Sequence, residues 1–362
     1  GANTYSGGTT LTAGAVLVGV DTVGSLGSIT SSAIGTGGLT FNGGTISSDS
    51  TTARTLYNVL TFTGNATIGY GSNTGAITFG AAGDLGSSTR TITVNTDTSA
   101  QFDGILSSVT AGTGLTKAGA GTLILTGANT YSGGTTLTAG AVLVGVDTVG
   151  SLGSITSSAI GTGGLTFNGG TISSDSTTAR TLYNVLTFTG NATIGYGSNT
   201  GAITFGAAGD LGSSTRTITV NTDTSAQFDG ILSSVTAGTG LTKAGAGTLI
   251  LTGANTYSGI TTISAGTLTN GAAGVINDSS AVQIANSATW NLAGYSETVY
   301  SIADVSGQTT GAITLGSGTL TIKNTGGTST TFSGVISGTG GVTLDASNTG
   351  TTVLAGANTY SG

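Results

Sequence analysis

The chain has 362 residues but no proline, cysteine, methionine or histidine, and only 6% of its residues are charged. At the usual frequency of about 5%, roughly eighteen prolines would be expected. Without them every residue can donate its backbone N–H group, which predicts β-sheet pairing along the whole chain. The lack of histidine and cysteine excludes Ser–His and Cys–His nucleophile pairs and leaves carboxylates as the remaining metal ligands.

The few charges are mostly acidic, with fourteen Asp and Glu against seven Lys and Arg, a net charge of −7. This balance argues against nucleic acid as a partner, because phosphate binding needs clustered positive charge. No apolar run approaches the roughly 18 residues of a membrane-spanning helix. A neutral surface rich in Thr, Ser and Asn predicts an extracellular location, and a thiol-free chain suits an oxidising compartment.

The most informative feature that is present is an exact repeat, because residues 1–126 recur without substitution as residues 127–252. Residues 253–355 form a shorter, diverged third unit, and residues 356–362 begin the same motif once more. We therefore predict two identical solenoid units, one diverged unit and the start of a further one. The chain is expected to be a window of a longer array.

Short segments that alternate apolar and polar residues follow one another, and Gly-rich corners separate them. Period-two alternation is typical of half-buried strands, and no stretch keeps helical spacing. A β-sandwich or propeller would show a linker between repeats, but residues 125–129 continue the same Gly/Thr/Leu pattern. The sequence thus predicts an all-β solenoid rod with about 20–25 residues per coil and a length of roughly 70–85 Å. The predicted strands of the first repeat are residues 10–12, 15–18, 38–42, 60–63, 76–79, 89–94 and 122–126.

One motif recurs at residues 114–140 and 240–268, with partial copies at residues 1–18 and 337–362. It resembles the passenger-associated transport repeat of Gram-negative autotransporter proteins, also called the autotransporter-associated β-strand repeat. The resemblance implies a right-handed parallel β-helix, export across the outer membrane with an outer-membrane β-barrel translocator as partner, and a place on the cell surface. It covers about a third of the chain, and its recurrence in identical units indicates a giant repetitive surface protein.

Within this motif the leucines that alternate with threonine are expected to point inward, namely Leu115, Leu123, Leu125 and Leu137. Gly127, Gly133 and Gly134 are expected at corners with positive φ. The Asn of the motif could cap a turn or stack on the equivalent Asn of a neighbouring coil, and the Tyr is expected to be a wall or corner aromatic. We assign structural roles to Asn3, Tyr5, Asn129, Tyr131, Asn255, Tyr257, Asn358 and Tyr360.

No catalytic, cofactor-binding or metal-binding residue is expected, and the chain is predicted not to be an enzyme. Its charged side chains are widely spaced and are expected to be solvated loop charges with one or two ion pairs. Asn95, Asp97 and Asp103 offer oxygen ligands for calcium, but a polar turn is the preferred interpretation. Trp290 and Tyr295 could form a sugar-stacking spot, although core or corner positions are favoured. The charged residues of the first repeat are Asp21, Asp49, Arg54, Asp84, Arg90, Asp97, Asp103 and Lys117.

These features predict the structural shaft of an extracellular fibre, either one long covalent chain or copies of the chain that assemble end to end through open coils. The alternative is an adhesin whose repetitive face recognises glycans, ice or another cell. Ranks of Thr-x-Thr are the feature that would serve ice binding, whereas threonine is also simply a favoured exposed strand residue.

Overall fold

The computed structural model describes residues 1–362, and all of its regular elements are strands. None of the chain forms a helix long and apolar enough to cross a membrane. The structure divides into two compact parts, residues 1–185 and 186–362, and each is described by itself. This division falls inside the second identical repeat, so the predicted repeat boundaries stay a prediction about the sequence.

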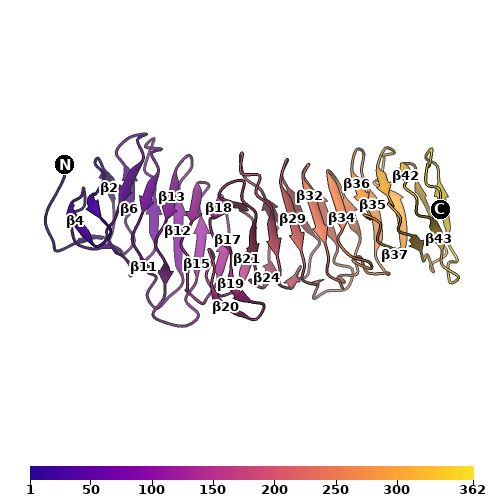
Figure 1. Ribbon diagram of the computed structural model, residues 1–362, viewed down its shortest axis with the longest axis horizontal. Coiled ribbons are helices and arrows are strands. Elements are labelled where there is room, and N and C mark those ends of the chain that lie inside the picture. The colour runs from indigo at the N-terminus through magenta and orange to yellow at the C-terminus, as the bar shows by residue number, and fades with distance from the viewer. The chain divides into compact units, whose positions relative to one another are not determined.

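Residues 1–185 form three parallel sheets to which each coil contributes in turn (Figure 1). The first sheet contains β1 (Thr9–Leu11), β5 (Leu39–Phe41), β8 (Leu60–Phe62), β11 (Gly83–Asp84) and β14 (Leu106–Ser107). The second contains β2 (Ala15–Val18), β6 (Thr45–Ser48), β9 (Ala66–Ile68), β12 (Arg90–Val94), β15 (Leu115–Ala118), β17 (Thr135–Leu137) and β21 (Leu165–Phe167). The third contains β7 (Arg54–Leu56), β10 (Ile77–Phe79), β13 (Ser99–Phe102), β16 (Thr122–Leu125), β18 (Ala141–Val144) and β22 (Thr171–Ser174), and β23 (Arg180–Leu182) follows it in the chain.

Residues 186–362 repeat this architecture with parallel pairing throughout. One group comprises β24 (Leu186–Phe188), β27 (Gly209–Asp210) and β30 (Leu232–Ser233). A second comprises β25 (Ala192–Ile194), β28 (Arg216–Val220), β31 (Leu241–Ala244), β33 (Thr261–Ile263), β35 (Ala281–Ile284) and β38 (Ser301–Asp304). A third comprises β26 (Ile203–Phe205), β29 (Ser225–Phe228), β32 (Thr248–Leu251), β34 (Thr267–Asn270), β36 (Thr289–Asn291), β39 (Ala312–Thr314) and β42 (Val335–Ser337). Smaller sheets are β37 (Glu297–Val299), β40 (Leu320–Ile322) and β43 (Val342–Leu344), and β41 (Ser329–Phe332) with β44 (Thr351–Leu354).

The predicted all-β parallel β-helix is confirmed, and the pairing register measures the coils. Ile77 pairs with Ala100, 23 residues along the chain, which agrees with the expected coil length. Thr122 pairs with Ala141, only 19 residues along, whereas Thr9 pairs with Leu39, 30 residues along. Coil length therefore varies, and the long coils carry an insertion.

The insertion is an antiparallel hairpin that the sequence patterns did not indicate. It is formed by β3 (Val23–Ser25) with β4 (Ser28–Ser31), and in the second repeat by β19 (Val149–Ser151) with β20 (Ser154–Ser157). Figure 1 shows β19 and β20 at the margin of the ribbon, outside the stacked coils. Each hairpin is thus an appendage on the solenoid rather than a part of its wall.

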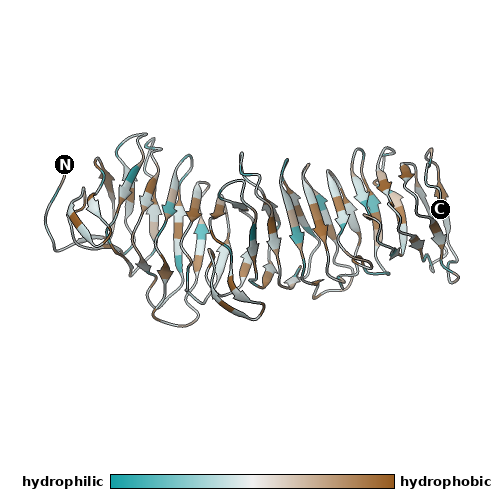
Figure 2. Ribbon diagram, viewed as in Figure 1, coloured by the Kyte–Doolittle hydropathy of each residue, from teal (hydrophilic) through white to brown (hydrophobic).

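The core consists of inward side chains that stack from coil to coil, and apolar and polar residues alternate along the strands (Figure 2). Phe41 stacks on Phe62 at a ring-centroid distance of 4.9 Å, and Phe79 stacks on Phe102 at 4.7 Å. Such pairs add roughly 0.5–1.5 kcal/mol beyond the area that they bury. All four leucines expected to face inward are buried, which confirms their prediction: Leu115, Leu123, Leu125 and Leu137.

The corner glycines are only partly as predicted. Gly134 has a φ of +75°, but Gly127 and Gly133 do not adopt positive φ. Glycine is needed there for another reason, because a Cβ on Gly127 would lie 2.4 Å from the carbonyl oxygen of Gly104, in the coil before. The absence of a side chain therefore lets adjacent coils approach, while backbone handedness explains Gly134 alone.

Identical repeats do not present identical residues in the same direction. β1 lies in the first sheet, but its copy β17 lies in the second; β2 lies in the second, but its copy β18 lies in the third. From one motif to the next the chain completes five coils and then moves on by one sheet, so a repeat occupies about five and a third coils. Within residues 1–185, equivalent surface features of the two repeats consequently point about a third of a turn apart.

Candidate functional site

The transport-repeat motif forms locks between coils. Asn129 is fully buried, and its side-chain oxygen accepts a hydrogen bond from the N–H of Leu106 at 2.7 Å. Its side-chain nitrogen donates to the carbonyl of Ala159 at 2.6 Å. One amide therefore joins its own coil to the coils before and after it. Both side-chain hydrogen bonds of Asn129 go to neighbouring coils, rather than to its own turn or to another Asn.

The other motif asparagines make the same contacts wherever a neighbouring coil lies beside them. Asn255 accepts from the N–H of Leu232 and donates to the carbonyl of Val275, each at 2.7 Å. Asn3 makes only the contact to the following coil, and Asn358 makes only the contact to the preceding one. The structure thus assigns one geometric function to all four positions.

The motif tyrosine adds a second lock. Tyr131 is fully buried, and its hydroxyl lies 2.7 Å from Thr135 Oγ1, which itself donates to the carbonyl of Ile160 in the next coil at 2.9 Å. Gly161 has a φ of +75°, and a Cβ on it would lie 2.5 Å from the Tyr131 ring. The ring therefore rests against a position that accepts only glycine.

Neighbouring coils decide how far this tyrosine is buried. Tyr257 is fully buried and binds Thr261 as Tyr131 binds Thr135, whereas Tyr5 keeps its hydrogen bond to Thr9 but is 48% exposed. Tyr360 is half-buried. Because residues 1–126 and 127–252 are identical, the difference between Tyr5 and Tyr131 measures what a preceding coil covers.

Two charged side chains depart from the expectation of solvated loop charges. Lys117 and Lys243 are fully buried inside the solenoid. The Lys117 ammonium donates to the carbonyls of Ala118, Gly119 and Ala139 at 2.8, 2.7 and 3.2 Å, so it joins the corners of adjacent coils. Burial lowers the pKa of Lys117 to about 8. The expectation was wrong here because each lysine occupies an inward strand position, as the alternation of β15 and β31 shows.

We expect amine acetylation of the folded chain to separate its three lysines. Lys323 is partly exposed, whereas Lys117 and Lys243 are enclosed, so the two buried amines should react at least about tenfold more slowly. The measurement is mass spectrometry of proteolytic peptides after a brief exposure to an N-hydroxysuccinimide ester at pH 8. Denatured protein is the control, in which all three should react alike. Equal labelling in the folded chain would contradict the buried lysine positions.

A buried polar chain lies in the third repeat. Glu297 Oε2 accepts from Asn270 Nδ2 at 2.6 Å and from the N–H of Val275 at 2.9 Å. Asn270 Oδ1 in turn accepts from the indole N–H of Trp290 at 2.9 Å. Trp290 is fully buried, so it does not form a surface sugar-stacking spot with Tyr295. Burial raises the pKa of Glu297 to about 7, and its Oε1 has no hydrogen-bond partner.

The remaining acids and bases are used in turns and local pairs. Arg54 forms an ion pair with Asp49 at 3.1 Å, and its guanidinium lowers the pKa of that carboxyl. Asp103 accepts hydrogen bonds from Gln101 and Thr126, and Asp97 lies in a turn with a φ of 60°. No group of three or more His, Cys, Asp and Glu side chains is placed to hold a metal ion. The other acids cap backbone groups, Asp21 at Thr55 and Asp84 at Gly86, and Arg90 donates to Leu85.

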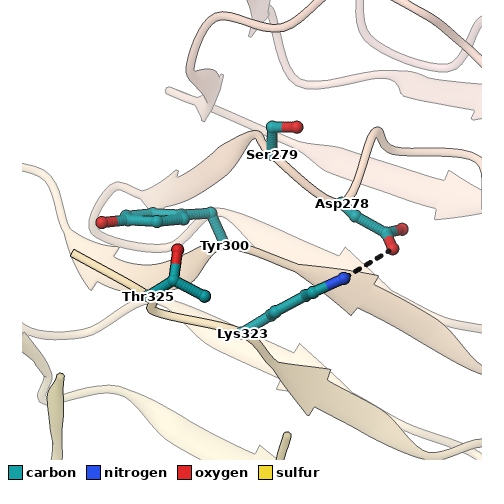
Figure 3. A pocket seen from close by; sticks show the side chains of 5 residues that line it. All are labelled: Asp278, Ser279, Tyr300, Lys323 and Thr325. Atoms are coloured by element: carbon teal, nitrogen blue, oxygen red, sulfur yellow. Dashed lines mark ion pairs between the residues drawn. The ribbon is translucent and has the colours of Figure 1, made fainter. Parts of the chain in front are cut away.

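One surface hollow of about 270 Å³ contains both an acid and a base (Figure 3). Lys323 Nζ lies 3.9 Å from Asp278 Oδ2, both side chains are exposed, and Tyr300 lies across the hollow from this pair. A solvated pair at this distance contributes little binding energy, roughly 0–1 kcal/mol. The hollow lies in the third unit, outside the identical repeats.

Comparison with known proteins agrees with the motif assignment. The passenger-associated transport repeat family matches residues 1–18, 115–144, 241–269 and 344–362, which confirms the resemblance predicted at all four places. The chain is also 32% identical over 306 residues to the adhesin BmaC autotransporter of Brucella suis biovar 1 (strain 1330). This alignment covers 82% of the chain but 8% of that much longer protein. No solved structure matches the chain.

Proposed function

We propose that this chain, which is autotransporter passenger sequence carried on the surface of a Gram-negative bacterium, acts there as a non-catalytic shaft that extends the protein from the cell. The observation that carries the proposal is the Asn–Tyr lock. The amide of Asn129 bonds to both adjacent coils, and the hydroxyl of Tyr131 bonds to Thr135, whose own hydroxyl reaches the next coil. In residues 127–252 these groups are therefore engaged within the solenoid.

The Asn–Tyr lock suits a load-bearing role because it joins adjacent coils along the solenoid axis, where each coil is held only by its neighbours. Coils contact only their neighbours, so the stability of a solenoid is a sum of coil and interface terms. A buried amide that bonds to two adjacent coils strengthens two interfaces at once. Its repetition allows length to increase without a larger core.

The shaft proposal predicts a fixed length increment for each repeat. Five and a third coils at about 4.8 Å per coil give roughly 26 Å, so the chain without residues 127–252 should be shorter by that amount and a chain with a second copy longer by the same amount. Electron microscopy of the three purified proteins measures the increments. Removing residues 127–252 recreates the native Thr–Gly junction, which controls for damage at the splice. Unequal increments would contradict the shaft.

End-to-end assembly of separate chains is a distinct form of the same proposal. Lengths that grow with protein concentration would support it, and lengths independent of concentration would support a covalent shaft. The translocator of the outer membrane is the partner that passenger sequence implies. The translocator would act during export, whereas other copies of the chain would act as partners during assembly.

An adhesive role is the second candidate, because the similar Brucella protein is named an adhesin. Ice is the least favoured ligand. Thr91, Thr116, Thr136 and Thr166 do stack in register across four coils. The neighbouring rank is interrupted, however, since Thr93 pairs with Ala118. A single rank does not make the flat, regular face that ordered water would need.

A further inference from the structure

A groove lies between each hairpin and the adjoining coil corner. In the first repeat Tyr57 and Val59 form one wall, Ile29 of the hairpin another, and Gly37 with Gly38 the corner, around about 220 Å³. The Tyr57 ring is half-buried and packs against Gly80. The ring lies so close to Gly80 that a Cβ on that residue would be 2.5 Å from it. Val59 is 61% exposed. The groove thus has a fixed aromatic wall that solvent reaches.

The same groove is built a second time by the second repeat. Tyr183, Val185, Ile155, Gly163 and Gly164 enclose about 280 Å³ in the equivalent arrangement. The first hairpin follows a strand of the second sheet and the second hairpin follows a strand of the third sheet. Within residues 1–185 the two grooves therefore open about a third of a turn apart and are separated along the coils by roughly 26 Å.

The chemistry of the walls selects for an uncharged polar ligand. No charged residue lines either groove, and the net charge of −7 repels acidic polymers. The hydroxyl of Tyr57 and the N–H groups of Gly37 and Gly38 form no hydrogen bond within the protein, and the same holds for Tyr183, Gly163 and Gly164. A sugar ring matches this set, because it has an apolar face to lie on an aromatic ring and hydroxyls to bond with free donors.

The size of the grooves limits the ligand further. Pockets that enclose a drug-sized molecule have volumes of about 300–1,000 Å³. Grooves of 220 and 280 Å³ hold less, which fits one sugar unit of a chain whose remainder stays in solvent. We propose that the two grooves are binding sites for neutral glycans, displayed in different directions around the solenoid so that a single repeat array presents them on more than one side.

The test is a titration of the purified 362-residue chain with neutral oligosaccharides of glucose, galactose, mannose and N-acetylhexosamines, two to six units long, followed by ligand-observed NMR. Hyaluronan and heparin fragments are the anionic comparison. We expect binding of at least one neutral series with two equivalent sites per chain and at least tenfold weaker binding of the anionic fragments. Failure of every neutral series to bind at millimolar concentration, or preference for an anionic one, would overturn the proposal.

The variant Val59→Asp/Val185→Asp places a charge in each groove through exposed side chains, so the fold should persist. It should weaken glycan binding at least tenfold with an unchanged melting temperature. Val109→Asp/Val235→Asp is the matched control, because these valines are 78% and 76% exposed in the same repeats and do not line either groove. Equal loss in both variants, or no loss in the first, would refute the assignment of the site. A shaft without sugar binding would still show the length increments, so the two proposals fail separately.

Discussion

Replacing Asn129 with alanine is expected to lower the free energy of unfolding by about 2–6 kcal/mol. The substitution leaves the Leu106 N–H and the Ala159 carbonyl without a partner in a buried place. Each buried polar group left unpaired costs about 1–3 kcal/mol. Guanidinium unfolding followed by circular dichroism measures the loss as a lower midpoint or as a separate early transition, since solenoid coils can unfold in segments.

The control is the same residue in the same local sequence. Asn3→Ala removes a single exposed hydrogen bond to Ala33 and should cost less than about 1 kcal/mol. Asn129→Asp distinguishes the two contacts further, because a carboxylate can accept from Leu106 but cannot donate to Ala159. A loss as large at Asn3 as at Asn129 would show that the motif acts within its own turn and not between coils.

Period-two alternation was sufficient to predict the inward leucines and the fold class. The same alternation contained the buried charges, since Lys117 follows Leu115 by two residues and Glu297 precedes Val299 by two. The general tendency of charged residues to be exposed outweighed that local signal. Register along a strand is therefore better evidence of burial here than residue type.

The hairpins, the partners of the motif asparagine and the rotation between repeats could not be predicted from the sequence. The hairpin β3–β4 has Gly24 and Gly27 at positive φ, but its strands have only three and four residues, too few for alternation to distinguish them from a loop. The contacts of Asn129 join residues 23 and 30 positions away, and those distances depend on the length of each coil. The rotation between the two identical repeats depends on the sum of the coil lengths over the whole repeat. Composition and periodicity carry no such information.

Glutamine in place of Glu297 should stabilise the chain above neutral pH and remove most of its stability change between about pH 4.5 and 7. The folded-state pKa of about 7 exceeds the ordinary value of 4.5, so the folded protein retains a proton that the unfolded chain has already lost. The stabilisation is therefore complete below about pH 4.5 and is lost as the pH rises through 7. A shift of this size corresponds to about 3 kcal/mol as an upper figure.

The contacts of Glu297 explain why glutamine is the suitable replacement. Its carbonyl can accept from Asn270 and Val275 as Oε2 does, and its NH2 group takes the place of the unpartnered Oε1 without carrying charge. Trp290 is the chain's single tryptophan and belongs to this network, so its fluorescence reports the unfolding of these coils. Asp278→Asn removes an exposed carboxylate and should leave the profile unchanged. If wild type and Glu297→Gln keep parallel profiles from pH 4 to 8, Glu297 is ionised in the folded chain, and the solenoid tolerates a buried charge that these contacts alone do not stabilise.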